Sequence, residues 1–504
     1  MKFRVAREPL GEAVAWVARA LPSRPVVPVL SGLLLSAAAD GLTLSCFDYQ
    51  VSALYRIDAE VTEPGTALVP GRLLAEIVRS LPGAPADFSG TADMVSLSCG
   101  SAEFALVALA ADEYPALPEP PLPAGTVDGG VFAAAAAQVA GSASKDDTLP
   151  MLTGVCLDIV GEVMTLVATD RYRLAVSEIR WSPATAGISA TALVPARTLA
   201  DVTRTMTRGE RVDISFDTGE TFAASGDAAE SVHSGGPAGS AQGSPVRPAA
   251  RAGRPVEGMI TFAGRGRRLT ARLIGGEFIR YQSRFPAEFD HHAELAAEPF
   301  LAAIRRVSLV ADRASPVSLT FRPGTVVIEA HADGRARAVE SVPARFSGAE
   351  PVISFNPGYL LDGLTAAALP AAVPAPTAAA PAAIEPGAGR RSGKAAEPAA
   401  DSGRIRFDFT SASKPALITW VGGQHGAQAP GPADGAREAP DAPEAGSGPY
   451  PASGGAGEAP ADEGRPAADT GGGPAGPAAG AGASLGFAPA FRYLVVPVRA
   501  IARS

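Results

Sequence analysis

The sequence is poor in the residues that usually form disulfides and metal sites. Its 504 residues include three cysteines and five histidines. The cysteines are odd in number, far apart, and each lies in an apolar or alternating run, so we expect Cys46, Cys99 and Cys156 to be reduced and buried. The histidines show no ligand spacing and no carboxylate pair converges on a predictable cleft. We therefore assign no metal, no cofactor and no catalytic residue.

Long apolar runs are also missing. None approaches the ~20 residues that a membrane-spanning helix needs. The N-terminus places Lys2, Arg4, Arg7 and Glu8 where a signal peptide needs its apolar region, so we expect a cytoplasmic protein with no membrane partner. The net charge of -9 argues against a chain coated with basic surface for nucleic acid, but it leaves room for a local basic face.

Alanine, glycine and proline are abundant instead, and they gather in three segments. These segments, at about 226–258, 370–403 and 422–486, hold few aliphatic residues that could build a core. We interpret them as disordered surface loops inserted between strands. The patterned remainder is enough for roughly three domains.

The patterned sequence is a threefold repeat. At an offset of 122, Leu30–Ile57 aligns without a gap on Leu152–Ile179, and both copies predict two alternating strands around a turn. Asp48 and Asp170 coincide, which suggests a turn-forming role for both. The basic cluster at 171–173 has no arginine in its first-copy counterpart.

Two helices accompany each pair of strands. The segment "LVPGRLLAEIVRSL" from Leu68 recurs at an offset of 125 as "LVPARTLADVTRTM", and more faintly as "SFNPGYLLDGL". Apolar residues at helical spacing also fill 8–21, 129–144 and 297–312. Each unit is thus helix, meander, helix and further strands, an α+β pattern. The Pro- and Ala-rich linkers between the units predict domains at 1–123, 127–286 and 287–504.

Four motifs occur in a recognisable order: "RPVVPVLSGLLL", "DDTLPMLTGV", "ATDRYRLAV" and "YLVVPVR". Together with the repeat, they resemble the bacterial DNA sliding clamp, the β subunit of DNA polymerase III, of actinobacterial type. The resemblance implies a head-to-tail homodimeric ring of three clamp domains per chain, with inner helices and outer antiparallel sheets. Such a ring encircles double-stranded DNA without reading its sequence. The resemblance also implies that the ring binds the polymerase III catalytic subunit, the clamp loader and other proteins that carry a clamp-binding motif, giving processivity without chemistry of its own.

The second helix of each of the first two units carries charged residues in register. Arg72, Glu76 and Arg79 match Arg197, Asp201 and Arg204 on the face opposite the leucines. One interpretation is a solvated face with internal salt bridges. The other, inside a clamp, is a face whose arginines contact phosphates weakly enough to slide. The resemblance adds two loop residues to the DNA-binding set, Arg24 and Lys145.

The resemblance also implies a cleft for partner peptides between the second and third domains. Its predicted walls are Leu152, Thr169, Arg171, Tyr172, Arg173, Leu174, Leu494, Val495, Val496, Pro497 and Arg499. For Leu174 the alternative is ordinary strand core. The sequence departs from the family at Ile279, where proline is usual, at Arg284, where an aliphatic residue is usual, and at Val496, which replaces a common methionine. These departures motivate the hypothesis of a specialised second clamp copy, with a cleft altered toward partners or toward a cleft-binding antibiotic.

Two motifs point to other classes of protein. The segment "SASK" has the Ser-x-x-Lys pattern of acylating serine enzymes at Ser411 and Lys414, without the Ser-Asp-Asn and Lys-Thr-Gly motifs that accompany it. A cytoplasmic serine hydrolase is thus the rival hypothesis. The segment 388–395, "AGRRSGKA", approaches a phosphate-binding loop but has Ala395 where a magnesium-binding hydroxyl is needed.

Overall fold

The computed structural model describes residues 1–91, 93–205, 210–217, 258–311, 315–332, 335–346, 348–369, 403–421 and 491–498. The three segments interpreted from composition as disordered loops lie almost entirely outside these residues. Among the described residues, no helix is long and apolar enough to cross a bilayer.

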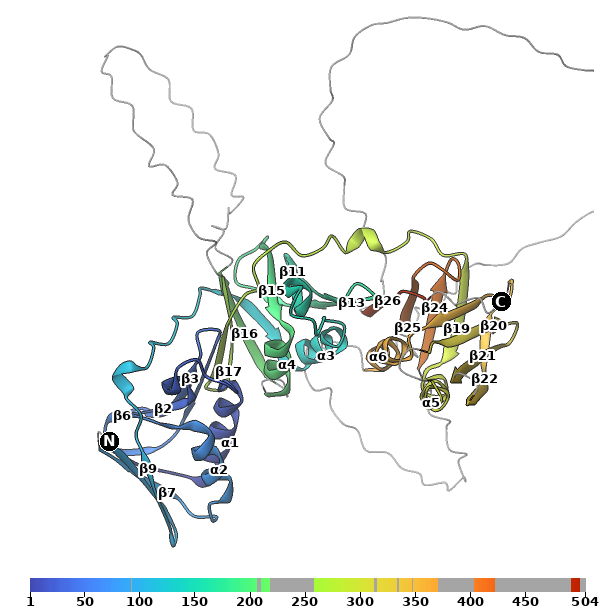
Figure 1. Cartoon of the computed structure of the whole chain (residues 1–504). Helices are drawn as coiled ribbons and strands as arrows, with labels where there is room; N and C mark the ends of the chain where they lie inside the picture. Colours follow the sequence, from blue (N-terminus) through green and yellow to red (C-terminus); the bar gives the residue numbers. More distant parts are fainter. Residues whose placement is uncertain are drawn as a thin grey trace, which may run out of the picture. The chain divides into compact units, whose positions relative to one another are not determined.

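The first unit alternates helix and strand as the repeat predicts (Figure 1). The strands β2, β3 and β4 form an antiparallel meander, while β1 pairs with both β5 and β7. The elements are β1 (Lys2–Val5), α1 (Arg7–Val17), η1 (Ala18–Ala20), η2 (Pro28–Ser31), β2 (Gly32–Ala38), β3 (Gly41–Phe47), β4 (Val51–Ile57), β5 (Glu60–Glu63), β6 (Gly65–Pro70), α2 (Gly71–Ser80), β7 (Ala86–Gly90), β8 (Met94–Cys99), β9 (Ala102–Val107) and η3 (Ala111–Glu113).

The second unit has the same order and the same pairings. Its first strand, β10, pairs with β14 and β16, as β1 pairs with β5 and β7. The elements are β10 (Pro123–Asp128), α3 (Gly129–Ala140), η4 (Pro150–Thr153), β11 (Gly154–Val160), β12 (Val163–Thr169), β13 (Arg173–Arg180), β14 (Ser182–Pro183), β15 (Ser189–Pro195), α4 (Ala196–Thr205), β16 (Arg211–Asp217), β17 (Met259–Gly264), β18 (Arg267–Arg272) and η5 (Gln282–Arg284).

The third unit merges two strands that are separate in the other units. Its long strand β22 pairs with β21 over most of its length, as β4 pairs with β3. At Ala344–Phe346 it pairs with β19, as β5 pairs with β1, so β22 corresponds to both β4 and β5. The elements are β19 (His291–Ala296), α5 (Ala297–Ser308), β20 (Val317–Arg322), β21 (Thr325–Ala332), β22 (Ala336–Phe346), β23 (Val352–Phe355), α6 (Pro357–Ala368), β24 (Arg404–Phe409), β25 (Ala416–Val421) and β26 (Phe491–Val495).

In each unit the two helices lie side by side against the strands, as Figure 1 shows for α1 with α2, α3 with α4, and α5 with α6. Leu74 and Val78 of α2 are buried, and so are Leu360 and Leu364 of α6. This spacing aligns the N-cap Pro70 with the N-cap Asn356. In the structure, Pro70 therefore corresponds to Asn356. A sequence alignment that matches Pro70 with the next proline, Pro357, is out of register by one residue.

Two antiparallel joints continue the sheets from one unit into the next. Strand β4 of the first unit pairs with β18 of the second, from Val51↔Ala271 to Tyr55↔Arg267. Strand β13 of the second unit pairs with β26 of the third, from Arg173↔Val495 to Ser177↔Phe491. In both cases the third meander strand of one unit meets the last strand of the following unit. We call these the first and the second joint.

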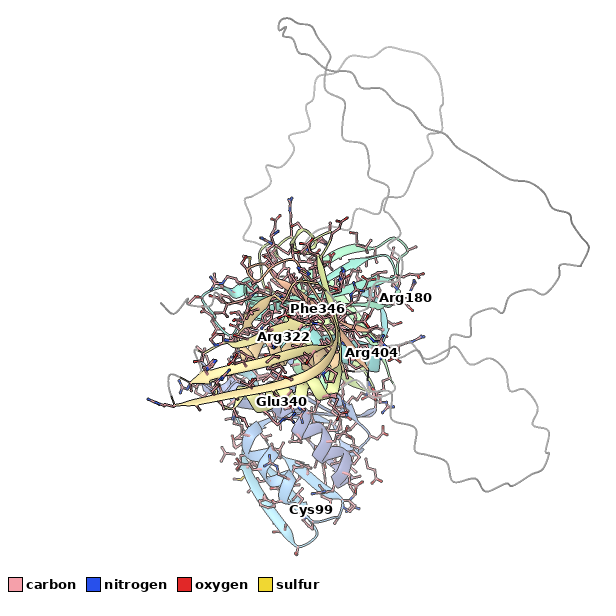
Figure 2. All side chains as sticks on the ribbon, turned by 90° about the vertical axis from the view of Figure 1, so that its right-hand side faces the viewer. Cys99, Arg180, Arg322, Glu340, Phe346 and Arg404 are labelled. Carbon is pink, nitrogen blue, oxygen red and sulfur yellow. The ribbon has the colours of Figure 1, made fainter. Side chains whose placement is uncertain are left out.

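The third unit shows how helix and sheet are tied together. Figure 2 looks onto β20 to β22 and labels Glu340 on β22, whose carboxylate accepts a hydrogen bond from Nε of Arg306 at 3.0 Å. Arg306 lies in the last turn of α5. Phenylalanines fill the space beneath, where the tilted rings of Phe321 and Phe409 have their centres 4.7 Å apart. The three cysteines are free and buried, which confirms the prediction from their surroundings.

Candidate functional site

The basic cluster at 171–173 is shaped by an aspartate turn. Oδ1 of Asp170 accepts hydrogen bonds from the backbone N–H groups of Tyr172 at 3.0 Å and Arg173 at 3.1 Å. Arg171 between them has φ = 83°, a left-handed conformation that non-glycine residues seldom adopt. Asp48 makes the same two bonds in the first unit, and Tyr49 has φ = 71°. The shared aspartates are therefore turn-forming, as the repeat predicts.

This turn opens onto a cleft of about 380 Å³ beside the second joint. The cleft has an apolar floor, because Leu174 and Leu494, which pair across the joint, are both nearly fully buried. Nine of the residues named from the sequence line it together: Leu152, Thr169, Arg171, Arg173, Leu174, Ile279, Arg284, Leu494 and Val496. Pro415, just before β25, completes the lining and was missed, because nothing in its local sequence marks it.

Other residues placed in the cleft wall from the sequence lie elsewhere. Val495 is fully buried in the main core, because alternation along β26 turns it away from Leu494. Tyr172 does not line the cleft; its ring is half exposed and stacks 5.9 Å from Tyr359. Pro497 is buried and does not line the cleft. Arg499 lies outside the described residues.

Arg173 lies at the edge of the cleft, but most of its hydrogen-bonding capacity is used inside the protein. Its Nε donates to Oδ2 of Asp170 at 3.0 Å, and Nη2 donates to the backbone O of Gly141 at 2.6 Å. Nη1 donates to Asp362 on α6 of the third unit, and the guanidinium lies 4.7 Å from the ring centre of Tyr359. Its side chain is only 6% exposed. Arg173 therefore ties the two units together, and its contribution to the cleft is chiefly structural.

The three departures from the family pattern, Ile279, Arg284 and Val496, all line the cleft. Ile279 is half-buried against the apolar cluster that includes Leu174 and Leu494, whereas Arg284, at the end of η5, is exposed. Nearby, the hydroxyl of Tyr281 donates to Oδ2 of Asp158 at 2.8 Å, which anchors the segment that carries them. Burial and this carboxylate raise the pKa of the Tyr281 phenol, so the tyrosine stays neutral and keeps donating.

The charged helix faces of the first two units are exposed as the spacing predicts. Arg72 and Arg79 of α2 and Arg197 and Arg204 of α4 all lie on the solvent side, opposite buried apolar residues. Arg204 pairs loosely with Asp201, at 3.7 Å. The solvated-face interpretation and the DNA-facing interpretation thus both fit this geometry. The second helix of the third unit has no arginine and presents Tyr359 and Asp362 instead.

The two predicted loop residues are also exposed. Arg24 lies two residues from Pro22, whose carbonyl accepts a hydrogen bond from Nη2 of Arg72 at 3.1 Å, so the loop and α2 form one local basic region. Lys145 is next to the exposed Asp146 and Asp147, which reduce the local positive charge.

The residues of the rival hydrolase hypothesis are not arranged as a catalytic site in the described part of the chain. Ser411 and Lys414 lie in the exposed turn between β24 and β25, and the one described side-chain partner of Ser411 is the hydroxyl of Ser413 at 3.4 Å. Within the described part of the chain, no hydrogen bond joins the Ser411 hydroxyl to a side chain that could act as its base. No group of three or more His, Cys, Asp or Glu residues in that part is arranged to hold a metal ion. The segment 388–395 lies outside the described residues.

Comparison with protein-family models defines the class to which this architecture belongs. Models of the N-terminal, central and C-terminal domains of the DNA polymerase III beta subunit match residues 1–118, 126–279 and 282–385. They follow one another in the order of the three structural units. The fold is thus that of a polymerase subunit built from three similar domains.

The curated relatives are more specific. The beta sliding clamp of Streptomyces coelicolor is 46% identical over 372 residues, which cover 74% of this chain and 90% of the relative. The clamp of Micrococcus luteus is 41% identical over 343 residues, covering 68% and 99%. The beta sliding clamp homolog GriR of Streptomyces muensis is 40% identical over 366 residues, covering 72% and 88%. This chain belongs to the beta sliding clamp family, and its actinobacterial resemblance is confirmed.

Solved structures show the same fold at lower identity. The DNA polymerase sliding clamp from Bacillus subtilis matches with a TM-score of 0.67 at 21% identity, over 99% of both chains. A sliding clamp from Pseudomonas aeruginosa bound to griselimycin matches with a TM-score of 0.66 at 19% identity, over 99% of this chain and 100% of that one.

Proposed function

We propose that this chain is a processivity subunit that encircles duplex DNA and tethers DNA polymerase III to it. The observation that carries the proposal is the repeated joint, in which the third meander strand of one unit pairs with the last strand of the next. A repeated joint of this kind can be continued into a closed ring. The chain binds DNA and other proteins and catalyses no reaction, as in the rest of its family.

Ring closure needs one more joint of the same type, between two copies of the chain. The last strand of the first unit, β9, ends its sheet, and the outer edge of β22 is unpaired over Ala336–Pro343 among the described residues. Each edge also exposes an apolar side chain, Val107 on β9 and Val339 on β22. A head-to-tail dimer would form this pairing twice, so that β9 and β22 would both lose their open edges. We expect V339D to sediment as a monomer where the wild type sediments as a dimer.

Inside the ring, the arginines of α2 and α4 would contact phosphates without reading bases. Arg24, Arg72, Arg79, Lys145, Arg197 and Arg204 are the proposed DNA contacts. We expect the pair of changes R79Q and R204Q to shorten the lifetime of the loaded clamp on DNA and to weaken its salt dependence. R180Q is the matched control, because Arg180 on β13 is equally exposed but lies on a strand; it is labelled in Figure 2. Equal effects of the two changes would contradict the assignment.

The cleft beside the second joint is the proposed docking site for the polymerase catalytic subunit, the clamp loader and other proteins with a short apolar motif. Its apolar floor and few polar groups suit a peptide anchor. Because the DNA that such a ring encircles is the chromosome, the proposed place of action is the nucleoid, in the cytoplasm.

The test of the topological model uses closed DNA. The clamp loader is used to load the chain on nicked circular DNA, which is then cut once. We expect the chain to stay bound to the circle and to leave after the cut. Equal retention on linear DNA would contradict encirclement.

Ile279 and Arg284 favour a second candidate, a specialised copy of the clamp with an altered cleft. The experiment is the affinity of a polymerase-derived clamp-binding peptide, measured for the wild type and for R284L. A wild type that binds weakly, with recovery in R284L, supports specialisation. Ordinary affinity in both proteins removes the reason for it.

A further inference from the structure

The cleft beside the second joint carries an excess of positive charge. Of the ten residues that line it, three are arginines and none is an aspartate or a glutamate. A docking site for a purely apolar peptide needs no such charge, because unpaired guanidinium groups beside an apolar surface are costly to desolvate when a ligand covers them. The positive charge of the cleft therefore indicates that its ligand carries a group that can pair with an arginine.

One of the three arginines is already neutralised. Arg173 is paired with Asp170 and with Asp362, and it donates a further hydrogen bond to the backbone of Gly141. Its charge is satisfied by the protein whether or not a peptide is bound. Arg173 therefore cannot account for a preference among ligands.

The other two arginines, Arg171 and Arg284, have no such partner among the described residues. Within the described part of the chain, no carboxylate forms an ion pair with Arg171 or Arg284. Arg171 lies 5.9 Å from the ring centre of Tyr172, a contact that leaves its hydrogen-bond donors available. The exposed Asp146 interacts only weakly with Arg171. The pKa of the Asp146 carboxyl is lowered first by hydrogen bonds from Thr148, and the charge of Arg171 is the smallest cause.

We propose that this cleft selects partner peptides that carry a carboxylate next to their apolar anchors, and that Arg284 is the residue that sets this preference. The proposal rests on the docking function of the cleft. The floor formed by Leu174, Leu494 and Ile279 receives the apolar side chains. The guanidinium of Arg284, with that of Arg171 on the same lining, receives the carboxylate.

The positions of the two arginines make Arg284 the better test. Arg171 is held by the aspartate turn with a strained backbone, so its substitution would also disturb the turn. Arg284 is exposed on the one-turn helix η5, and its backbone N–H donates to the carbonyl of Tyr281 at 3.0 Å whatever its side chain is. Replacing Arg284 by glutamine therefore removes the charge and leaves the segment in place.

The experiment is a binding measurement with a panel of fluorescein-labelled hexapeptides. Each peptide carries two leucines and a phenylalanine as anchors, and the panel places a single aspartate, asparagine or lysine at each of the remaining positions in turn. Fluorescence anisotropy gives Kd for the full-length wild type, for R284Q and for R280Q. Arg280 is the matched control, because it is an exposed arginine of the same segment that does not line the cleft.

For at least one position we expect the aspartate peptide to bind about fivefold more tightly than its asparagine partner, the range of an exposed ion pair. We expect this ratio to fall to about one in R284Q, to persist in R280Q, and to shrink as salt is raised. A lysine at the same position should bind more weakly than asparagine.

The outcomes separate the preference from the docking function itself. If aspartate and asparagine peptides bind the wild type equally, the charge preference is refuted while the docking function stands. A preference for aspartate that survives in R284Q refutes the role of Arg284. If no peptide of the panel binds, both the preference and the proposed docking function are refuted.

Discussion

The two joints have the same strand pairing but leave very different surfaces. At the first joint, Tyr114 fills the space beside the aspartate turn, and its hydroxyl accepts a hydrogen bond from the backbone N–H of Phe47 at 2.7 Å. It packs against a small apolar cluster of Val29, Leu30 and Leu68. At the second joint, the corresponding space is the open cleft of about 380 Å³. The same strand pairing thus gives one joint with a filled space and one joint with an open cleft.

The difference comes from the segment that follows each unit. After the first unit, this segment brings Tyr114 to the end of β3. After the second unit, it brings Tyr281 to Asp158, which lies opposite Thr165 in the strand register. Thr165 lies four residues before Thr169, which is the position equivalent to Phe47. The Tyr281 hydroxyl is therefore bound away from Thr169, and Thr169 lines the cleft. A side chain placed by a connecting segment decides whether the repeat can accept a ligand.

The joints also differ in how the neighbouring units are held. Arg173 at the second joint occupies the position of Val51 at the first, and it reaches Asp362 of the next unit. The first joint uses Arg267 of β18, which pairs with Glu12 of α1 and lies 4.7 Å from the ring centre of Tyr55. Each joint therefore has a largely buried arginine stacked on a tyrosine, supplied from a different place in the repeat.

The largest expected effect is that of R173M at the second joint. The change removes the charged partner of the largely buried Asp170 carboxylate and the donor to the carbonyl of Gly141, and breaking a buried ion pair costs about 3 kcal/mol. We expect urea unfolding to show a loss of this size, together with loss of peptide binding in the cleft. V51A, at the equivalent position of the first joint, is the control and should cost about 1 kcal/mol. A smaller loss for R173M than for V51A would contradict the assigned role.

Much of this comparison could be predicted from local sequence, and the rest could not. The helix faces at Leu74 and Leu199 and the turns at Asp48 and Asp170 follow from spacing, because they depend on residues within one or two turns of chain. The pairing of Arg173 with Asp362 and the closing role of Tyr114 depend on residues far apart in sequence, so periodicity carries no sign of them. The prediction that Val495 lines the cleft was wrong, because neighbouring residues of β26 point to opposite faces of the sheet.

The second test opens the closed joint. Tyr114 is partly buried over the apolar cluster, so Y114A should cost about 2 to 3 kcal/mol through lost packing, and Y114F about 1 kcal/mol through the lost hydrogen bond to Phe47. Thermal unfolding of the two variants separates the ring from the hydroxyl. Equal losses in both would mean that the ring contributes no packing and that the joint is not closed by it.

The third test compares the two arginines. Arg267 is 12% exposed, but its partner Glu12 is 60% exposed, so solvent screens the ion pair at the first joint more than the pair with Asp170 at the second. We expect R267M to cost about 1 to 2 kcal/mol, less than R173M under the same urea titration. E12Q is the matched change on the other side and should cost less than R267M. A larger loss for R267M than for R173M would reverse the ranking of the joints.

The smallest effect on the fold, and the finest comparison, comes from the cysteines beneath the two joints. Burial raises the pKa of both the Cys46 thiol, in the first unit, and the Cys156 thiol, under the cleft, to about 12. A raised pKa means less thiolate at a given pH, so at pH 8 both should react with iodoacetamide about a thousandfold more slowly than a free cysteine. The rates should keep rising above pH 9, where a free thiol levels off. Because the cleft admits solvent close to Cys156, we expect Cys156 to react before Cys46, as mass spectrometry of partly alkylated protein can show. A plateau near pH 9, or earlier labelling of Cys46, would mean that the first joint is as open as the second.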